Sequence, residues 1–145
     1  MAIRHLDHVG ITVSDLDAAL DFFVGLGLEV EGRMDMEGEF VDTVTGIPGS
    51  RSEIAMLTQP GGGTKLELSA FAHPEHQPGN PAAMSTELGL RNIAFEVEDL
   101  HGMVDRLAAQ GFSLVGGIGD WQDQWRMTYV RGPEGIIVAL AERLT

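Results

Sequence analysis

Two separate segments of the chain alternate between apolar residues and polar or small ones. In residues 8–13 every second residue is apolar, with the first apolar side chain at Val9. Residues 92–97 repeat this alternation, starting from Ile93. A period of two is typical of a β-strand that packs on one side only. Each segment therefore predicts a half-buried strand.

The apolar period changes to a helical one directly after each predicted strand. Ser14 or Asp15 is expected to cap a first helix, with Gly25 or Gly27 at its end. Gly111 is expected to end a second helix. The apolar positions at helical spacing are Leu16, Ala19, Leu20 and Phe23 in the first helix and Leu100, Met103, Val104 and Leu107 in the second.

Shorter β segments are expected after each helix. They lie at residues 28–33, 52–57 and 65–70 in the first half, and at 113–115, 126–130 and 136–141 in the second. Glycine and proline at 59–63 and at 131–135 supply turns between the last two strands of each half. Each half is therefore predicted to have the order β-α-β-β-β.

The two halves are copies of one unit. Residues 8–16 align without gaps on residues 92–100, an offset of 84 positions. Prolines at three positions in residues 72–88 indicate a surface linker. We therefore predict a single domain over residues 1–145, built from repeats at about 5–71 and 89–142 and joined by this linker.

One repeat alone would leave a four-stranded sheet with an uncovered face. Such a sheet is not stable by itself, so we expect the repeats to pair around a shared concave cavity, and the chain to form a homodimer. The sequence leaves open whether the cavity lies within one chain or across two.

Composition narrows the range of partners. The 145 residues are 43% hydrophobic, enough for a sizeable core, and 22 acidic against 9 basic residues give a net charge of −13. Such a charge repels nucleic acid and anionic membranes. The chain has no cysteine, which excludes disulfides and thiolate metal ligands. It shows no secretory signal and no membrane-spanning apolar run, so a cytoplasmic location is expected.

Three segments resemble the vicinal oxygen chelate superfamily, which includes glyoxalase I, bleomycin-resistance proteins and extradiol dioxygenases. They are residues 5–16 (HLDHVGITVSDL), 89–100 (GLRNIAFEVEDL) and 131–138 (RGPEGIIV). The resemblance implies an α+β fold in which two βαβββ modules form a half-open β-barrel. It also implies a metal held at four positions, in the first and last strand of each half.

The first half matches this metal pattern and the second half departs from it. His8 and Glu67 occupy the two first-half positions, whereas Asn92 and Ala139 occupy the second-half ones. Glu142 is a poor substitute, because three residues along a strand it projects to the opposite face. At most one divalent ion is expected, weakly held by His8 and Glu67 with the Asn92 carbonyl. The alternative for His8 is a strand histidine that is satisfied by a backbone or side-chain partner, and the alternative for Glu67 is a solvent-facing strand carboxylate.

Candidate ligand contacts lie outside the metal positions. Trp121 and Trp125 could stack on an aromatic ligand or pack in the core, and Arg126 adds a cation beside them. In residues 124–129 one alternating set faces the cavity and the other the core, and the sequence does not decide which. Phe40 belongs to a glycine-flanked segment that could cover the cavity.

The resemblance and the incomplete metal set together favour a small-molecule-binding protein of the glyoxalase/bleomycin-resistance type. Its ligand is expected to be aromatic or hydrophobic. The alternative is a glyoxalase-like lyase, isomerase or epimerase in which Glu67 is a metal ligand or a catalytic base. A dioxygenase fits less well, since Asn92 stands where a second histidine is required. A scaffold that serves dimer contact is the third class.

Overall fold

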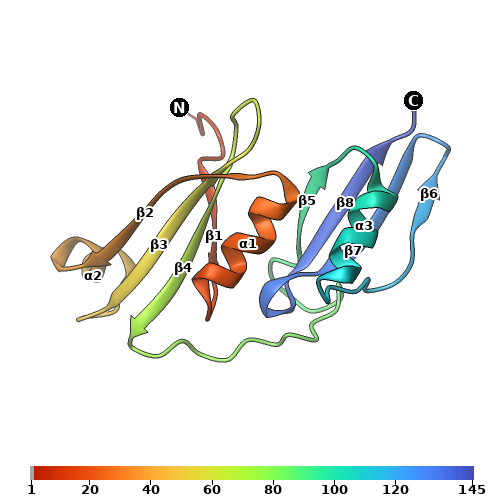
Figure 1. Ribbon diagram of the computed structural model, residues 1–145. Helices are drawn as coiled ribbons and strands as arrows, with labels where there is room; N and C mark the ends of the chain where they lie inside the picture. Colours follow the sequence, from red (N-terminus) through yellow and green to blue (C-terminus); the bar gives the residue numbers. More distant parts are fainter. Residues whose placement is uncertain (1) are drawn as a thin grey trace. The chain divides into compact units, whose positions relative to one another are not determined.

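A computed structural model describes residues 2–145 and divides the chain into two compact units, Met1–Pro78 and Gly79–Thr145 (Figure 1). Each unit has its own sheet, and the cavity that the halves are predicted to share remains a prediction. Within the described residues, no helix is long and apolar enough to cross a membrane.

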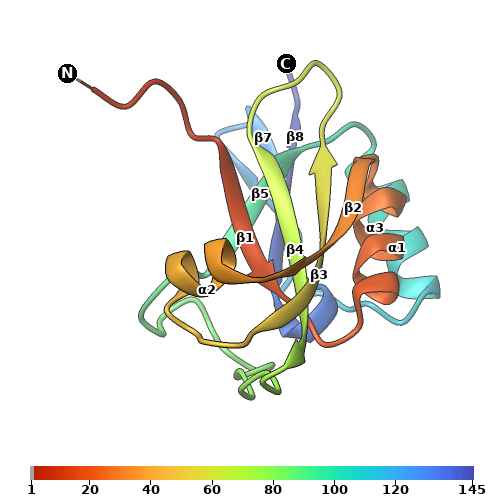
Figure 2. The same cartoon turned by 90° about the vertical axis from the view of Figure 1, so that its left-hand side faces the viewer.

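The first unit is a four-stranded sheet with two helices. Its elements are β1 (His8–Thr12), α1 (Leu16–Leu26), β2 (Glu29–Glu37), α2 (Glu39–Thr45), β3 (Arg51–Thr58) and β4 (Lys65–His73). The strand order is β1-β4-β3-β2, in which β1 and β4 are parallel and the other pairs are antiparallel. In both views α1 lies along one side of this sheet and α2 lies toward the other (Figures 1 and 2).

The second unit repeats this topology. Its elements are β5 (Asn92–Glu96), α3 (Leu100–Ala109), β6 (Gly119–Trp121), β7 (Trp125–Arg131), a short 3-10 helix η1 (Pro133–Gly135) and β8 (Ile137–Arg143). The strand order is β5-β8-β7-β6, again with one parallel pair, β5 and β8. The predicted α+β class, with two units of β-α-β-β-β order, is confirmed; α2 is an addition within the first.

Side-chain caps start both long helices. The Asp15 carboxylate accepts a hydrogen bond from the Ala18 amide at 3.0 Å, so Asp15 rather than Ser14 is the N-cap of α1. The Asp99 carboxylate accepts one from the Gly102 amide at 3.1 Å at the start of α3. Gly27 ends α1 with a φ of 119°, a left-handed conformation that glycine adopts without steric cost.

Each unit has an apolar core between its helix and one face of its sheet. Helix α1 buries Leu16, Ala19, Leu20, Phe22 and Phe23, and its sheet buries Ala55, Leu57, Leu66 and Leu68. Helix α3 buries Leu100, Met103 and Leu107, and its sheet buries Val130, Val138 and Leu140. Burial of these side chains is the main stabilising term in each unit.

One expectation about local structure was wrong, and one strand is longer than expected. Residues 113–115 do not form a strand: Leu114 makes a single bridge to Val130, and the second strand of the unit is β6. Gly116 and Gly117 lie between this segment and β6, and glycines disfavour continued strand pairing, so the strand begins only at Gly119. The first-half segment at 28–33 also extends further, to Glu37, as β2.

Candidate ligand-binding site

His8 and Glu67 come together on the face of the first sheet opposite α1. The parallel register of β1 and β4 pairs Gly10 with Glu67, which places Glu67 diagonally across from His8. The His8 Nε2 and Glu67 Oε2 atoms lie 3.6 Å apart, and both side chains are partly exposed. We call this side of the sheet its open face, because the buried leucines of β4 point the other way, toward α1.

Asp7 holds the imidazole of His8. The Asp7 Oδ2 atom lies 2.7 Å from His8 Nδ1, and since a carboxylate only accepts hydrogen bonds, Nδ1 is the donor. The hydrogen bond with His8 is the main reason that the pKa of Asp7 lies below its ordinary value of 3.8. This contact directs Nε2 toward Glu67 and gives the chain of polar groups Asp7, His8 and Glu67.

The second unit has the same register with different residues. Ala94 pairs with Ala139 as Gly10 pairs with Glu67, so Asn92 and Ala139 stand where His8 and Glu67 stand in the first unit. Ala139 is only 1% exposed. Glu142 of β8 points toward α3, where its Oε1 atom accepts a hydrogen bond from the Leu100 amide at 2.9 Å.

Aromatic residues lie on the face of the second sheet that is opposite α3, which we also call the open face of that sheet. Trp121 pairs with Trp125 across β6 and β7, and Trp121 is 57% exposed. The Arg143 guanidinium lies 4.2 Å from the centre of the Trp125 ring, and Arg143 Nε is 3.5 Å from Glu96 Oε1. One face of the Trp125 ring is therefore already occupied, whereas Trp121 is accessible.

Arg126 lies on the helix side of this sheet, away from Trp121 and Trp125. Its Nε and Nη2 atoms donate to the two carboxylate oxygens of Asp120 at 2.9 and 3.1 Å. This pair lowers the pKa of Asp120 and raises the pKa of Arg126. Because it faces Asp120 and not the tryptophans, Arg126 clamps β6 to β7.

Phe40 belongs to α2, which the sequence suggested only as a covering segment. Phe40 is 73% exposed, and α2 buries none of its residues. The Asp42 carboxylate anchors the helix by accepting hydrogen bonds from the Gly49 and Ser50 amides at 2.9 and 3.3 Å. Phe40 and the His8–Glu67 pair belong to the same unit.

Comparison with known proteins places the chain in a family. The model of the Glyoxalase/Bleomycin resistance protein/Dioxygenase superfamily matches residues 5–140. The chain belongs to this superfamily. The resemblance noted in the sequence is thereby confirmed.

Solved structures agree with the superfamily match. A glyoxalase family protein from Bacillus cereus is 39% identical with a TM-score of 0.96, and the match covers 100% of this chain and 97% of that one. A glyoxalase family protein from Enterococcus faecalis is 25% identical with a TM-score of 0.65, covering 98% and 100%. The antibiotic binding protein TnmS3 from Streptomyces sp. CB03234 shares the fold, at 21% identity, a TM-score of 0.64 and coverage of 99% and 98%. The search of curated proteins found no match.

The metal chemistry of the superfamily does not fit the donors of this chain. Across residues 2–145, no group of three or more His, Cys, Asp or Glu side chains is arranged to hold a metal ion. The first unit offers His8 and Glu67, while three protein ligands are usual for a catalytic metal. Asn92, a weak neutral donor, belongs to the second unit.

Sequence inspection missed the apolar part of the first open face. Met56 pairs with Glu67, Ile54 with Ser69, and Met34 with Ile54, so these side chains share the face of Glu67. Met34 is 57% exposed. The alternation along β2 does not reveal this face, because a register shift between Val30 and Gly32 turns the later residues of the strand to the other side. A cavity of about 490 Å³ in the same unit lies elsewhere, at the ends of β2, β3 and β4, and does not include His8 or Glu67.

Proposed function

We propose that this superfamily member binds and sequesters an aromatic or hydrophobic small molecule, and that its metal site is incomplete. One observation carries the proposal: the same strand register presents His8 and Glu67 in one unit and Asn92 and Ala139 in the other. Two of the four metal positions of the superfamily thus lack a strong donor. Two donors hold a divalent ion weakly at best.

Apolar side chains on the open faces support ligand binding. Met34 and Met56 offer a polarizable surface that adapts to different ligand shapes, and Trp121 offers an accessible ring for stacking. Phe40 and Trp125 are further proposed contacts, and Asn92 a proposed polar one. The name of TnmS3 describes an antibiotic binding protein on the same fold. Arg126 is left out of the proposed contacts because it faces Asp120.

A metal-free enzyme is the second candidate, and the Asp7–His8–Glu67 contacts favour it. Asp7 fixes the imidazole of His8, and His8 Nε2 lies 3.6 Å from the Glu67 carboxylate. In an isomerase, epimerase or lyase of this kind, Glu67 would accept a proton from carbon next to a substrate carbonyl.

Tryptophan fluorescence and elemental analysis test the first proposal against the second. We expect 1-naphthol to quench Trp fluorescence in a saturable way and to raise the melting temperature. Trp121→Phe should remove most of the quenching, and Trp125→Phe should remove less of it, because the Arg143 guanidinium already covers one face of the Trp125 ring. We also expect elemental analysis to find no tightly held stoichiometric metal.

Three results would contradict the proposal. A stoichiometric ion that is lost in His8→Ala would favour a metal enzyme. Turnover of a carbonyl substrate in chelator, abolished in Glu67→Gln, would favour the metal-free enzyme. A lack of any response to naphthol or metal would favour a scaffold.

Sedimentation would test the proposed homodimer, whose mass is expected to be twice the 15.6 kDa of the chain.

A further inference from the structure

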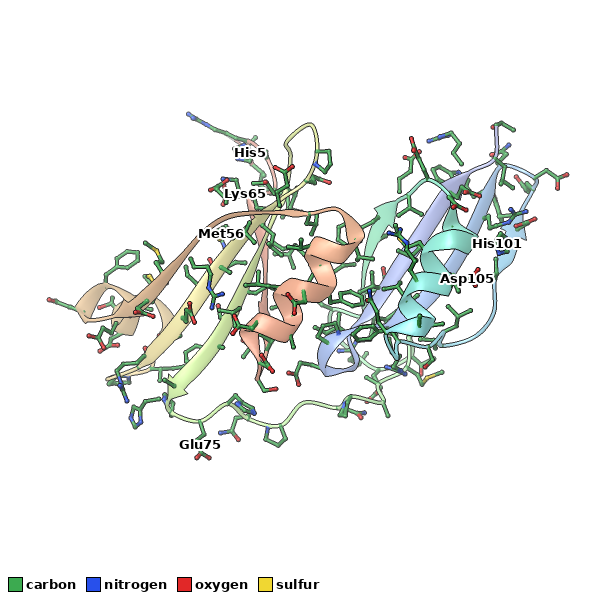
Figure 3. All side chains as sticks on the ribbon, viewed as in Figure 1. His5, Met56, Lys65, Glu75, His101 and Asp105 are labelled. Atoms are coloured by element: carbon green, nitrogen blue, oxygen red, sulfur yellow. The ribbon has the colours of Figure 1, made fainter. Side chains whose placement is uncertain are left out.

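Glu67 lies in a row of residues that crosses the open face of the first sheet. The register places Gly10 of β1, Glu67 of β4, Met56 of β3 and Gly32 of β2 side by side. A Cβ atom added to Gly10 or Gly32 would meet nothing within 4 Å, so there is open space at both ends of the row. We call these four residues the Glu67 row; Figure 3 labels Met56 and also Lys65, which lies two residues before Glu67 on β4.

The carboxylate of Glu67 keeps acceptor capacity for a ligand. Its contacts with Ser69 Oγ, at 3.5 Å, and with His8 Nε2, at 3.6 Å, are both long for hydrogen bonds. The Glu67 side chain is 28% exposed, so it is partly shielded from water but accessible. A partly shielded carboxylate gains binding free energy from a hydrogen-bond donor that replaces the water lost on burial.

Other charges on this face favour a cation over an anion. Lys65 already pairs with Glu31: the Lys65 Nζ atom lies 2.8 Å from Glu31 Oε2. The His8 ring donates to Asp7. The carboxylates of Asp7, Glu31 and Glu67 stand beside one lysine and the imidazoles of His5 and His8, on a chain with a net charge of −13. An anionic ligand would be repelled here.

We propose that the Glu67 row binds the protonated amine of a ligand whose apolar body lies against Met56 and the two glycines. The ammonium group donates to the Glu67 carboxylate. This inference rests on the proposed function and adds the ligand class, a cationic amphiphile with an aromatic or aliphatic body. The open space at Gly10 and Gly32 accommodates a flat or linear body.

Methyl NMR of the full chain, labelled with ¹³C at the methionine methyl groups, tests this proposal. The probes are 2-(1-naphthyl)ethylamine, its neutral isostere 2-(1-naphthyl)ethanol and the anion 1-naphthaleneacetate, each titrated at pH 8, where an alkylamine is protonated. We expect the Met56 and Met34 signals to shift. We also expect the amine to bind about tenfold more tightly than the alcohol, in the range of a charge-assisted hydrogen bond.

Three variants assign the effect to the row. Glu67→Gln should remove the preference for the amine while leaving the affinity for the alcohol unchanged. Asp35→Asn is the matched control: it removes the same charge from an exposed residue of β2 on the opposite face, and should change neither affinity. Gly10→Val should weaken amine and alcohol alike, because the new side chain fills the space above the row.

The outcomes separate this inference from the proposed function. Equal binding of amine and alcohol at Met56, unchanged by Glu67→Gln, would overturn the cation proposal and leave small-molecule binding intact. An equal loss of amine affinity in Asp35→Asn and Glu67→Gln would also overturn it, since the effect would then come from net charge. Probes that bind only at Trp121, without a shift at Met56, would exclude the Glu67 row as the site. No shift with any probe, and no quenching of tryptophan, would overturn both.

Discussion

The two sheets share a topology and a register, yet their open faces carry opposite chemistry. In the first sheet Gly10, Glu67 and Met56 stand in one row; in the second, Ala94, Ala139 and Tyr129 occupy the equivalent row. The faces turned to the helices are alike, since both are lined by buried aliphatic residues. The repeated fold is therefore specified by the helix-facing positions, and the open faces are free to diverge.

The two open faces differ in charged and in aromatic side chains. The first open face has an acid beside methionines, and the second has tryptophans, with Trp125 already under the Arg143 guanidinium. At the equivalent strand positions the first unit carries His8 and Glu67, and the second carries Asn92 and Ala139. The predictions below test how far the two units can be exchanged, starting with the largest effect.

Glu67 and Ala139 occupy equivalent positions, but substitutions at the two positions should have very different effects on stability. Ala139→Glu places a carboxylate at a position that is 1% exposed, and should lower the free energy of unfolding by about 3–5 kcal/mol, as expected for an unpaired buried charge. Glu67→Ala, at a partly exposed position, should cost less than about 1 kcal/mol. Urea unfolding measures both. Equal costs would mean that the two positions differ less in environment than their burial indicates.

The helix-facing cores should respond alike. Leu68 of β4 and Leu140 of β8 are both fully buried, so Leu68→Ala and Leu140→Ala should each lower stability by about 3 kcal/mol through lost burial and a cavity. Met34→Ala, on the exposed side of β2, is the control and should cost less than about 1 kcal/mol. If one leucine is tolerated and the other is not, the units are not equivalent in their cores.

The fold was predictable where one residue period extends over a whole element. The alternation at residues 8–13 and 92–97 and the helical spacing after it located β1, α1, β5 and α3, because each element buries one face. Helix α2 was missed, since it has seven residues and buries none of them, which leaves no apolar period to detect. The segment expected as a strand at 113–115 forms only one bridge to β7, because Gly116 and Gly117 directly after it disfavour further pairing.

The candidate site was predictable only in part, because direction depends on register. His8 and Glu67 were expected together and lie 3.6 Å apart. The sequence could not decide which alternating set of β7 faces the helix, and the register assigns Arg126 to that side. The contact of Asp7 with His8 could not be foreseen, since adjacent residues in a strand normally point apart. Residues 2–7 precede β1, where that rule does not hold.

Solvent quenching should distinguish the two tryptophans of the second open face. Trp121 is 57% exposed, whereas the Arg143 guanidinium covers one face of Trp125. Acrylamide should therefore quench Trp125→Phe, which retains Trp121, about twice as strongly as Trp121→Phe. Arg143→Gln should raise the quenching of Trp125 toward that of Trp121. If Arg143→Gln has no effect, the guanidinium does not shield the ring, and Trp125 is as available to a ligand as Trp121.

Acid titration should give the smallest effect and separate the two faces of the second sheet. The hydrogen bond from Arg126 holds the pKa of Asp120 below its ordinary value of 3.8, so the folded state binds this proton less readily than the unfolded state. The stabilisation is therefore fully present above that ordinary value, and is lost as the pH falls through the lower folded value. Arg126→Gln should return the pKa of Asp120 toward 3.8 and slightly lower stability at neutral pH, with the difference from the wild type fading under acid conditions.

Carboxyl-detected NMR reports the Asp120 titration, and Arg143→Gln provides a control that removes the same charge from the open face. Arg126 faces Asp120 on the helix side, so its removal should leave naphthol binding at Trp121 unchanged. An Asp120 carboxyl that titrates at the same pH with and without Arg126 would show that the clamp between β6 and β7 carries no electrostatic stabilisation. A loss of naphthol binding in Arg126→Gln would instead mean that Arg126 contributes to ligand binding. Binding residues would then lie on both faces of this sheet.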